Sequence, residues 1–190
     1  MGIADAKPVQ NVRKALRDAG LDDGMIVLIE PAESPADVAR MLDADVGAVA
    51  VARFFFIGKR MVLVIAAGDH APVEENLGPA VFLDGDVREA ADADVRGLTG
   101  YTADCLPPVG WRHAQPVVID RSLKRFETLY ALAGDPQCAF AISMDGLKRL
   151  TGGTVSWNIA RPIEGSADVP RMPRNRTFSG GREILGPDGE

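Results

Sequence analysis

The first half of the chain alternates helical and strand patterns of hydrophobic residues. Apolar positions at i, i+4 and i+7 predict an amphipathic helix over residues 12–19, which Gly20 is placed to end. The apolar run 25–29 predicts a short buried strand. Ser34 suits an N-cap, with Pro35 in the first helical position and Asp37 three residues after the cap, so a second helix is expected to begin there.

Two long apolar runs follow, over residues 49–57 and 60–66, separated by Gly58-Lys59. A two-residue connection with glycine favours a tight turn between antiparallel strands. The sequence therefore predicts a β-hairpin across this segment.

The second half continues as a mixture of short helices and strands. Helices are predicted over residues 73–77 and 91–98, and one more is capped by Ser143. Short apolar runs predict strands over residues 81–83, 117–119, 129–132 and 139–142. The acidic segment 84–94 is expected to be a solvated face, and residues 101–115 a stiff loop. The pattern predicts an α/β protein with a mixed sheet.

The domain boundary is expected near residue 160. Residues 1–160 carry the hydrophobic patterns and form the predicted domain, whereas Pro, Gly, Ser and Arg dominate residues 161–190. This composition predicts a flexible tail. Within it, Arg171, Arg174 and Arg176 form a small basic cluster.

Composition excludes several classes of protein. With 46% hydrophobic and 25% charged residues, 190 residues suffice for one folded domain. No apolar run approaches the roughly 18 residues of a membrane span, and no leader pattern is visible, so the cytoplasm is the expected compartment. A net charge of −6 argues against wrapping long nucleic acids, so no DNA partner is expected.

Cysteine and histidine are scarce, with two of each. No zinc-ligand spacing or disulfide framework results, so neither a metal site nor a cofactor is expected. Cys105 and His113 could in principle act as a thiol nucleophile and its base. The alternative is a loop cysteine and a surface histidine without catalytic roles.

Seven short pieces, in this order and spacing, resemble the YbaK/ProX family of aminoacyl-tRNA deacylases over roughly residues 25–155. They are residues 51–56 (VARFFF), 67–70 (AGDH), 98–101 (LTGY), 107–110 (PPVG), 116–123 (PVVIDRSL), 133–136 (AGDP) and 143–152. The resemblance implies a single compact YbaK-like domain, with a mixed, mostly antiparallel sheet, a barrel-like core and flanking helices. It also implies a hydrolase acting in trans, whose cleft receives the acceptor end of a tRNA and removes a small noncognate amino acid.

The resemblance also implies the site. Arg53 falls where the family has its characteristic lysine, and Gly134 lies in a turn that faces the substrate, so both are implied to be catalytic. The substrate-binding residues expected in this site are Pro108, Gly110 and Asp135, together with Phe54 and Asp104, which stand where the sequence departs from the family pattern and would reshape the pocket or contact a substrate ammonium or hydroxyl. The implied partners are the aminoacylated acceptor end of a tRNA and an aminoacyl-tRNA synthetase.

Three departures from the family pattern bear on activity. Arg53 replaces lysine, Phe54 replaces a small or polar residue, and Asp104-Cys105 replaces paired glycines. Arginine keeps a permanent charge and donates parallel hydrogen bonds, but it is wider and does not lose a proton near neutrality. It can therefore serve if the cation only stabilises charge or binds a phosphate, but not if a neutral amine or a narrow fit is required.

An ester hydrolase of this kind needs no catalytic triad. An aminoacyl ester beside a ribose hydroxyl is already activated, so orienting it towards water provides much of the acceleration. Backbone groups and one cation can stabilise the developing charge. Two alternatives stay open: a noncatalytic module of the same fold that binds a tRNA 3′ end or a nucleotide-like ligand, and a thiol hydrolase built on Cys105 and His113.

Overall fold

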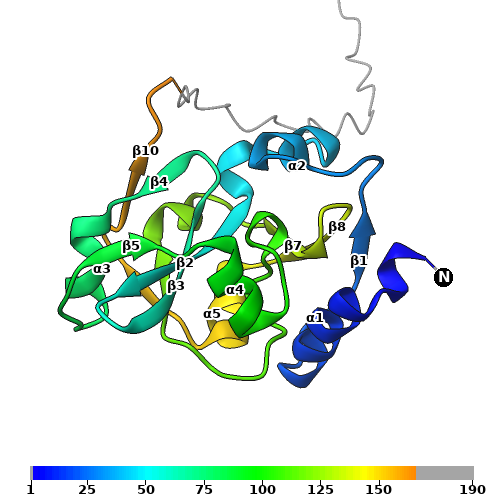
Figure 1. Cartoon of the computed structure of the whole chain (residues 1–190). Coiled ribbons are helices and arrows are strands. Elements are labelled where there is room, and N and C mark those ends of the chain that lie inside the picture. The colour runs from blue at the N-terminus through cyan, green and yellow to red at the C-terminus, as the bar shows by residue number, and fades with distance from the viewer. Residues whose placement is uncertain (1, 166–190) are drawn as a thin grey trace, which may run out of the picture.

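The β2–β3 hairpin is the centre of the fold (Figure 1). The structure is a computed structural model and describes residues 2–165. Strands β2 (Ala50–Ile57) and β3 (Arg60–Ala67) pair antiparallel along their whole lengths. Gly58 has a φ of 58°, the left-handed conformation that such a turn requires. The predicted hairpin is confirmed, with β3 one residue longer.

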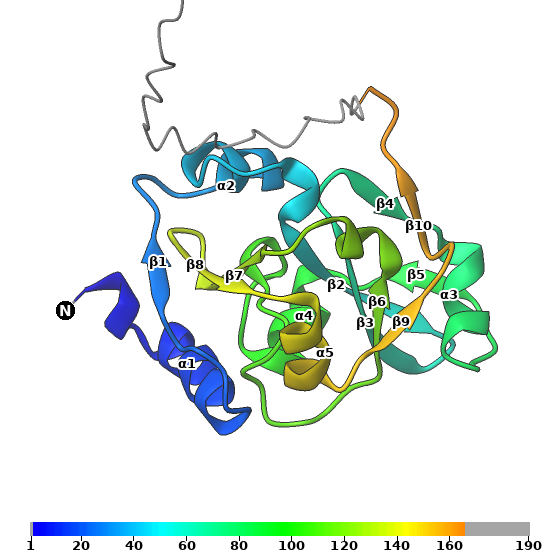
Figure 2. The ribbon, with the colours of Figure 1, turned by 180° about the vertical axis from the view of Figure 1, so that it is seen from behind.

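A five-stranded sheet is built outward from this hairpin in the order β5-β2-β3-β6-β9. The added strands are β5 (Val87–Glu89), β6 (Val117–Asp120) and β9 (Thr154–Ser156). β2 pairs antiparallel with β5 on one side and with β3 on the other, whereas β6 pairs parallel with β3 and β9 pairs parallel with β6. Figure 2 shows β6 and β9 from the side opposite to Figure 1.

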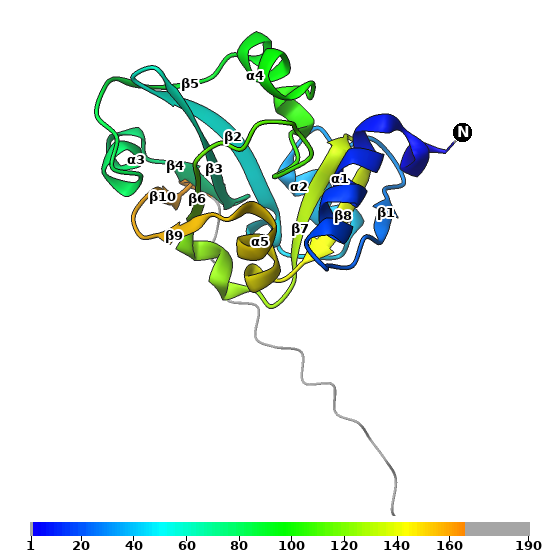
Figure 3. The same ribbon diagram turned by 90° about the horizontal axis from the view of Figure 1, so that it is seen from below.

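A second sheet has three antiparallel strands in the order β1-β8-β7. These are β1 (Met25–Val27), β8 (Cys138–Ile142) and β7 (Leu129–Asp135). Helix α1 (Lys7–Asp18) lies along one side of β7 and β8 (Figure 3), and α2 (Pro35–Met41) packs on the opposite face. An isolated parallel bridge between Val49 and Tyr130 joins the two sheets where β2 begins.

Capping residues mark the ends of three helices. Ser34 accepts a hydrogen bond from the Asp37 N–H at the start of α2, and Ser143 caps α5 (Met144–Thr151) in the same way. Helix α4 (Asp92–Thr99) ends at Gly100, which has a φ of 79°. Helix α1 begins five residues before the predicted start. The remaining helices are α3 (Glu74–Ala80) and the 3-10 turns η1 (Ile3–Asp5), η2 (Val46–Ala48), η3 (Ala103–Cys105) and η4 (Arg121–Arg125).

The strand predicted over residues 81–83 is wrong. This segment is a turn in which Phe82 has a φ of 56° and is 96% exposed. The strand lies instead within the acidic segment, where β5 pairs with Phe55, Phe56 and Ile57. The hydrogen bonds of the sheet edge outweigh the low strand propensity of this charged sequence.

A two-stranded ribbon of β4 (His70–Pro72) and β10 (Ala160–Pro162) crosses the predicted domain boundary. Arg161 and Pro162 of the predicted tail are thus paired with β4. The arginine cluster at positions 171, 174 and 176 lies outside the described residues.

The α/β class with a mixed, mostly antiparallel sheet is confirmed. The described strands form separate sheets rather than a closed barrel. The largest hydrophobic cluster lies between the two main sheets, and a smaller one lies under α3. Every helix in residues 2–165 is too short or too polar to cross a membrane.

Asp69 ties the end of β3 to η4. Arg125 Nη2 donates to both carboxylate oxygens, at 2.8 and 2.9 Å, and His70 Nδ1 lies 2.7 Å from Oδ1. Burial by itself raises the pKa of the Asp69 carboxyl, but the hydrogen bonds from Arg125 and His70 outweigh it, and the pKa falls below its ordinary value.

Because the pKa of the Asp69 carboxyl is lower in the folded protein, the cluster stabilises the fold at any pH above the carboxyl's pKa in the unfolded chain, about 3.9. This stabilisation is lost as the pH falls through the pKa of the folded state. We expect Asp69→Asn to lower the free energy of unfolding at pH 7 and to flatten its decline between about pH 5 and pH 2. Urea titrations across this range measure the effect, with the exposed Asp84→Asn as control. Parallel pH curves for Asp69→Asn and the wild type would contradict this role.

Candidate functional site

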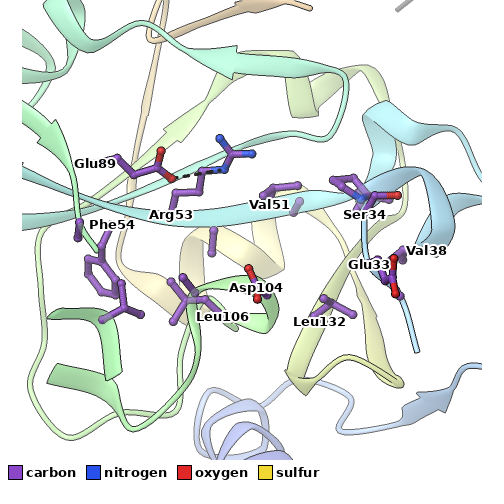
Figure 4. A pocket seen from close by; sticks show the side chains of 18 residues that line it. Glu33, Ser34, Val38, Val51, Arg53, Phe54, Glu89, Asp104, Leu106 and Leu132 are labelled. Carbon is purple, nitrogen blue, oxygen red and sulfur yellow. Dashed lines mark ion pairs between the residues drawn. The ribbon is translucent and has the colours of Figure 1, made fainter. Parts of the chain in front are cut away.

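A cavity of about 350 Å³ lies along the free edge of β2. The start of α2 borders it on one side, and the end of β5, α4 and the η3 segment border it elsewhere (Figure 4). Leu132 of β7 contributes from the second sheet. The cavity therefore forms where the two sheets and the capped end of α2 meet.

Main-chain atoms of β2 form one wall of the cavity. The cavity contacts every residue from 49 to 54, although side chains in a strand alternate between faces, so a continuous run indicates contact with the backbone. Strand β5 pairs with residues 55–57 and the Ala90 N–H donates to the Phe54 carbonyl oxygen, while β7 bridges at Val49, so the unpaired part of this edge lies between these contacts. Counted from the hairpin turn, Ala52 directs its N–H and C=O towards this edge.

Arg53 lies at the rim of the cavity in a weak ion pair. Its Nε is 3.9 Å from Glu89 Oε1, and both side chains are about half exposed, at 46% and 52%. The end of the guanidinium is turned away from Glu89 (Figure 4). An exposed pair at this distance contributes less than about 1 kcal/mol, so Arg53 can exchange Glu89 for a ligand oxygen at little cost.

Carboxylates outnumber cations around the cavity. Among the described residues that line it, Glu33, Glu89 and Asp104 are acidic and Arg53 is basic, which gives a formal charge of −2. Asp104 lies on the opposite side of the β2 ribbon from Arg53 (Figure 4). The cavity can therefore attract an ammonium group and stabilise one negative oxygen at different points.

No side chain on the described lining is poised as a nucleophile. Ser34 carries the one side-chain hydroxyl there, and it is engaged in the α2 cap. Its Oγ accepts from the Asp37 N–H at 3.2 Å and donates to Asp37 Oδ2 at 2.7 Å.

Phe54 is both a core residue and part of the cavity wall. It is 1% exposed and makes an edge-to-face contact with Trp111, with ring centroids 5.5 Å apart. The half-buried Trp111 thus supports the wall from behind.

Two of the predicted site residues, Gly110 and Gly134, meet at Tyr101 rather than at the cavity. Their φ angles are 106° and 84°, and a Cβ on either would lie within 2.5 Å of the Tyr101 side chain. The buried Tyr101 hydroxyl is 3.1 Å from the Pro8 carbonyl oxygen and 3.2 Å from that of Gly110. Helix α1 covers this cluster, since Val12 also approaches Gly110.

The other two predicted residues also lie outside the lining. Pro108 is buried in the loop before Gly110. Asp135 turns into its own hairpin, where Oδ1 accepts a hydrogen bond from the Gln137 N–H at 2.8 Å. The structure thus brings together Arg53, Phe54 and Asp104 of the predicted set.

Cys105 is buried beside the cavity, with its Sγ 3.1 Å from Thr102 Oγ1. Burial raises the pKa of this thiol, and the nearby carboxylates of Asp135 and Asp104 raise it further. The reactive thiolate is therefore disfavoured at neutral pH. His113, its proposed base, is exposed on the loop.

Comparison with known proteins identifies the family. Residues 29–150 match the sequence family described as an aminoacyl-tRNA editing domain. The chain belongs to this family. Among curated proteins, none matches the chain.

Solved structures share the fold of this editing domain. A protein described as "a putative trans-editing enzyme for prolyl tRNA synthetase" is 25% identical, with a TM-score of 0.74 over 80% of this chain and 96% of its own. A scaffold protein from computational epitope grafting is 24% identical, with a TM-score of 0.75 over 83% of this chain and 99% of its own. A hypothetical protein is 21% identical, with a TM-score of 0.71 over 80% of this chain and 99% of its own.

Sequence reasoning missed two of the three acidic residues on the described lining, Glu33 and Glu89. Ser34 is recognisable as a helix cap, and the adjacent Glu33 could have been inferred to lie near that helix end. Glu89 gave no such signal, because its place beside Arg53 depends on the pairing of β5 with β2.

Proposed function

We propose that this editing-domain protein is a stand-alone aminoacyl-tRNA deacylase that removes a small noncognate amino acid from mischarged tRNA. The observation that carries the proposal is the cavity along β2, with a main-chain wall, Arg53 at its rim and Asp104 on the other side. These groups match an aminoacyl ester, which combines a carbonyl oxygen that becomes negative with a positive ammonium.

In the proposed reaction, water is the nucleophile. Asp104 attracts the substrate ammonium, and the main chain of β2 together with Arg53 stabilises the carbonyl oxygen as charge develops. The water oxygen bonds to the carbonyl carbon, the bond from that carbon to the ribose oxygen breaks, and a proton from water ends on the ribose oxygen. The products are the free amino acid and a tRNA with its 3′-terminal hydroxyl restored.

The cavity's modest size and its Phe54 wall support a small amino acid as the group removed. Selection among small side chains depends on differences of one methylene or hydroxyl, so each candidate is to be tested directly. Burial and the nearby carboxylates of Asp135 and Asp104 raise the pKa of the Cys105 thiol and outweigh its hydrogen bond with Thr102, which disfavours a thiol mechanism.

Deacylation assays on tRNAs charged with Ala, Ser, Cys, Thr and Pro test the proposal. We expect hydrolysis of at least one noncognate ester, and Cys105→Ser should hydrolyse it with unchanged kcat/KM. Loss of hydrolysis confined to Cys105→Ser would instead establish the thiol mechanism. Retained tRNA binding without hydrolysis of any ester would make the protein a noncatalytic binding module.

A further inference from the structure

The acidic cavity poses a problem for an RNA ligand. Its described lining has a formal charge of −2, and the whole chain has a net charge of −6. Both repel a phosphodiester backbone, which proteins bind through clustered Lys and Arg. A positive surface elsewhere on the domain is therefore needed to hold the rest of the nucleic acid.

Such a surface lies on η4 and the segment after β9. A groove of about 440 Å³ is bordered by the η4 patch, which we define as Arg121, Lys124, Arg125, Trp157 and Asn158. Arg121 and Lys124 are exposed, and neither forms an ion pair with a described residue. Arg125 differs, because Asp69 holds it from beneath.

A stacking contact between two of its side chains holds the patch in place. The Arg121 guanidinium lies over the Trp157 ring, 3.1 Å from its centroid, and Trp157 is 64% exposed. Stacking on an aromatic face fixes a planar guanidinium and leaves its N–H groups at the edge for oxygen acceptors.

The acidic residue that borders this groove is directed inward. Asp120 is only 3% exposed and accepts hydrogen bonds from the Ser122 N–H, at 3.1 Å, and from the Ser122 hydroxyl. Its carboxylate is thereby used to cap η4. The exposed face of the groove is left to Arg121 and Lys124.

The η4 patch lies near the cavity, at the same end of the hairpin. Pro35 of the cavity packs on Gly68, since a Cβ there would be 2.8 Å from Pro35 Cβ, and the next residue, Asp69, binds Arg125. The β2 edge and β6, which leads into η4, are separated by β3 alone, and two strand spacings amount to about 10 Å. One ligand can therefore reach both places.

We propose that the η4 patch binds the phosphodiester backbone of tRNA while the cavity holds its aminoacylated end. This inference rests on the proposed function for the ligand's identity. Arg121 and Lys124 supply the contacts with phosphate, and Trp157 positions Arg121.

The test measures the affinity of uncharged tRNA by fluorescence anisotropy at several salt concentrations. Arg121→Ala/Lys124→Ala should raise Kd at least about tenfold and make the salt dependence shallower by about two phosphate contacts. The control, Lys59→Ala/Arg60→Ala, removes the same charge from the far end of the hairpin, about 25 Å along β3, and should bind like the wild type. Equal weakening of both variants, or no weakening of the η4 variant, would overturn the proposal.

Activity provides a separate measurement. On a charged full-length tRNA, the η4 variant should show a raised KM with unchanged kcat, whereas a short aminoacylated oligonucleotide matching the 3′ end should be hydrolysed at the wild-type rate. An equal loss on the short substrate would place the η4 residues in catalysis and overturn the proposal. If no ester is hydrolysed at all, the proposed function fails, and the binding measurements still decide the role of the patch.

Discussion

Arg53→Ala is expected to lower kcat/KM for deacylation about 100-fold, the loss typical of removing one donor to a developing oxyanion. Arg53 is the cation on the described lining of the cavity, and its pair with Glu89 is long and exposed. The substitution should therefore leave the melting temperature nearly unchanged, so that the effect is on chemistry rather than on folding.

Two matched variants serve as controls for Arg53→Ala. Arg88→Ala likewise removes an exposed guanidinium, but this one belongs to β5 and lies over Phe56, outside the cavity. The Arg88→Ala variant should therefore retain wild-type activity. Arg53→Lys introduces the residue that the family resemblance implies at this position and should stay within about tenfold of the wild type, since a charge is kept but the planar donor pair is lost. If Arg53→Ala deacylates as fast as the wild type, the cation has no part in the reaction.

Gly134→Ala is expected to destabilise the protein by about 3 kcal/mol, through left-handed backbone strain and overpacking together. Its φ is 84°, and the added methyl would lie 2.4 Å from Tyr101 Cε1. Tyr101 has little room to move, because its ring is buried and its hydroxyl contacts the Pro8 and Gly110 carbonyl oxygens.

Gly100→Ala separates the two contributions. Gly100 has a similar φ of 79° but nothing within 4 Å of its added Cβ, so the substitution should cost only about 1 kcal/mol. Urea denaturation of both variants gives the difference. Equal losses at the two positions would show that Tyr101 yields to the methyl and that the contact carries no energy.

The sequence predicts those elements that local rules define. The hairpin at Gly58 and the caps at Ser34 and Ser143 need only neighbouring residues, and all three are confirmed. Strand β5 was missed because it is a short piece of an acidic segment, and it becomes a strand only by pairing with the edge of β2. The opposite error occurred at Phe82: an aromatic residue in an apolar run predicted a strand, but Phe82 lies exposed in a turn.

In the candidate site, too, some features follow from the sequence, whereas others depend on contacts between distant parts of the chain. Position 53 and Asp104 follow from the order of the family's motifs, and both line the cavity. The motif order also implied Gly110 and Gly134, but it could not show that α1 lies over them. Helix α1 precedes the matched residues 29–150, and its contact with β7 links residues far apart in the chain.

The exposed main chain of β2 has an evolutionary consequence. Every residue except proline carries the same peptide N–H and C=O groups, so most point mutations between positions 50 and 54 reshape the walls of the cavity without removing its hydrogen-bonding edge. Proteins that descend from one ancestor can thus diverge in ligand specificity while they keep the same backbone hydrogen-bonding groups.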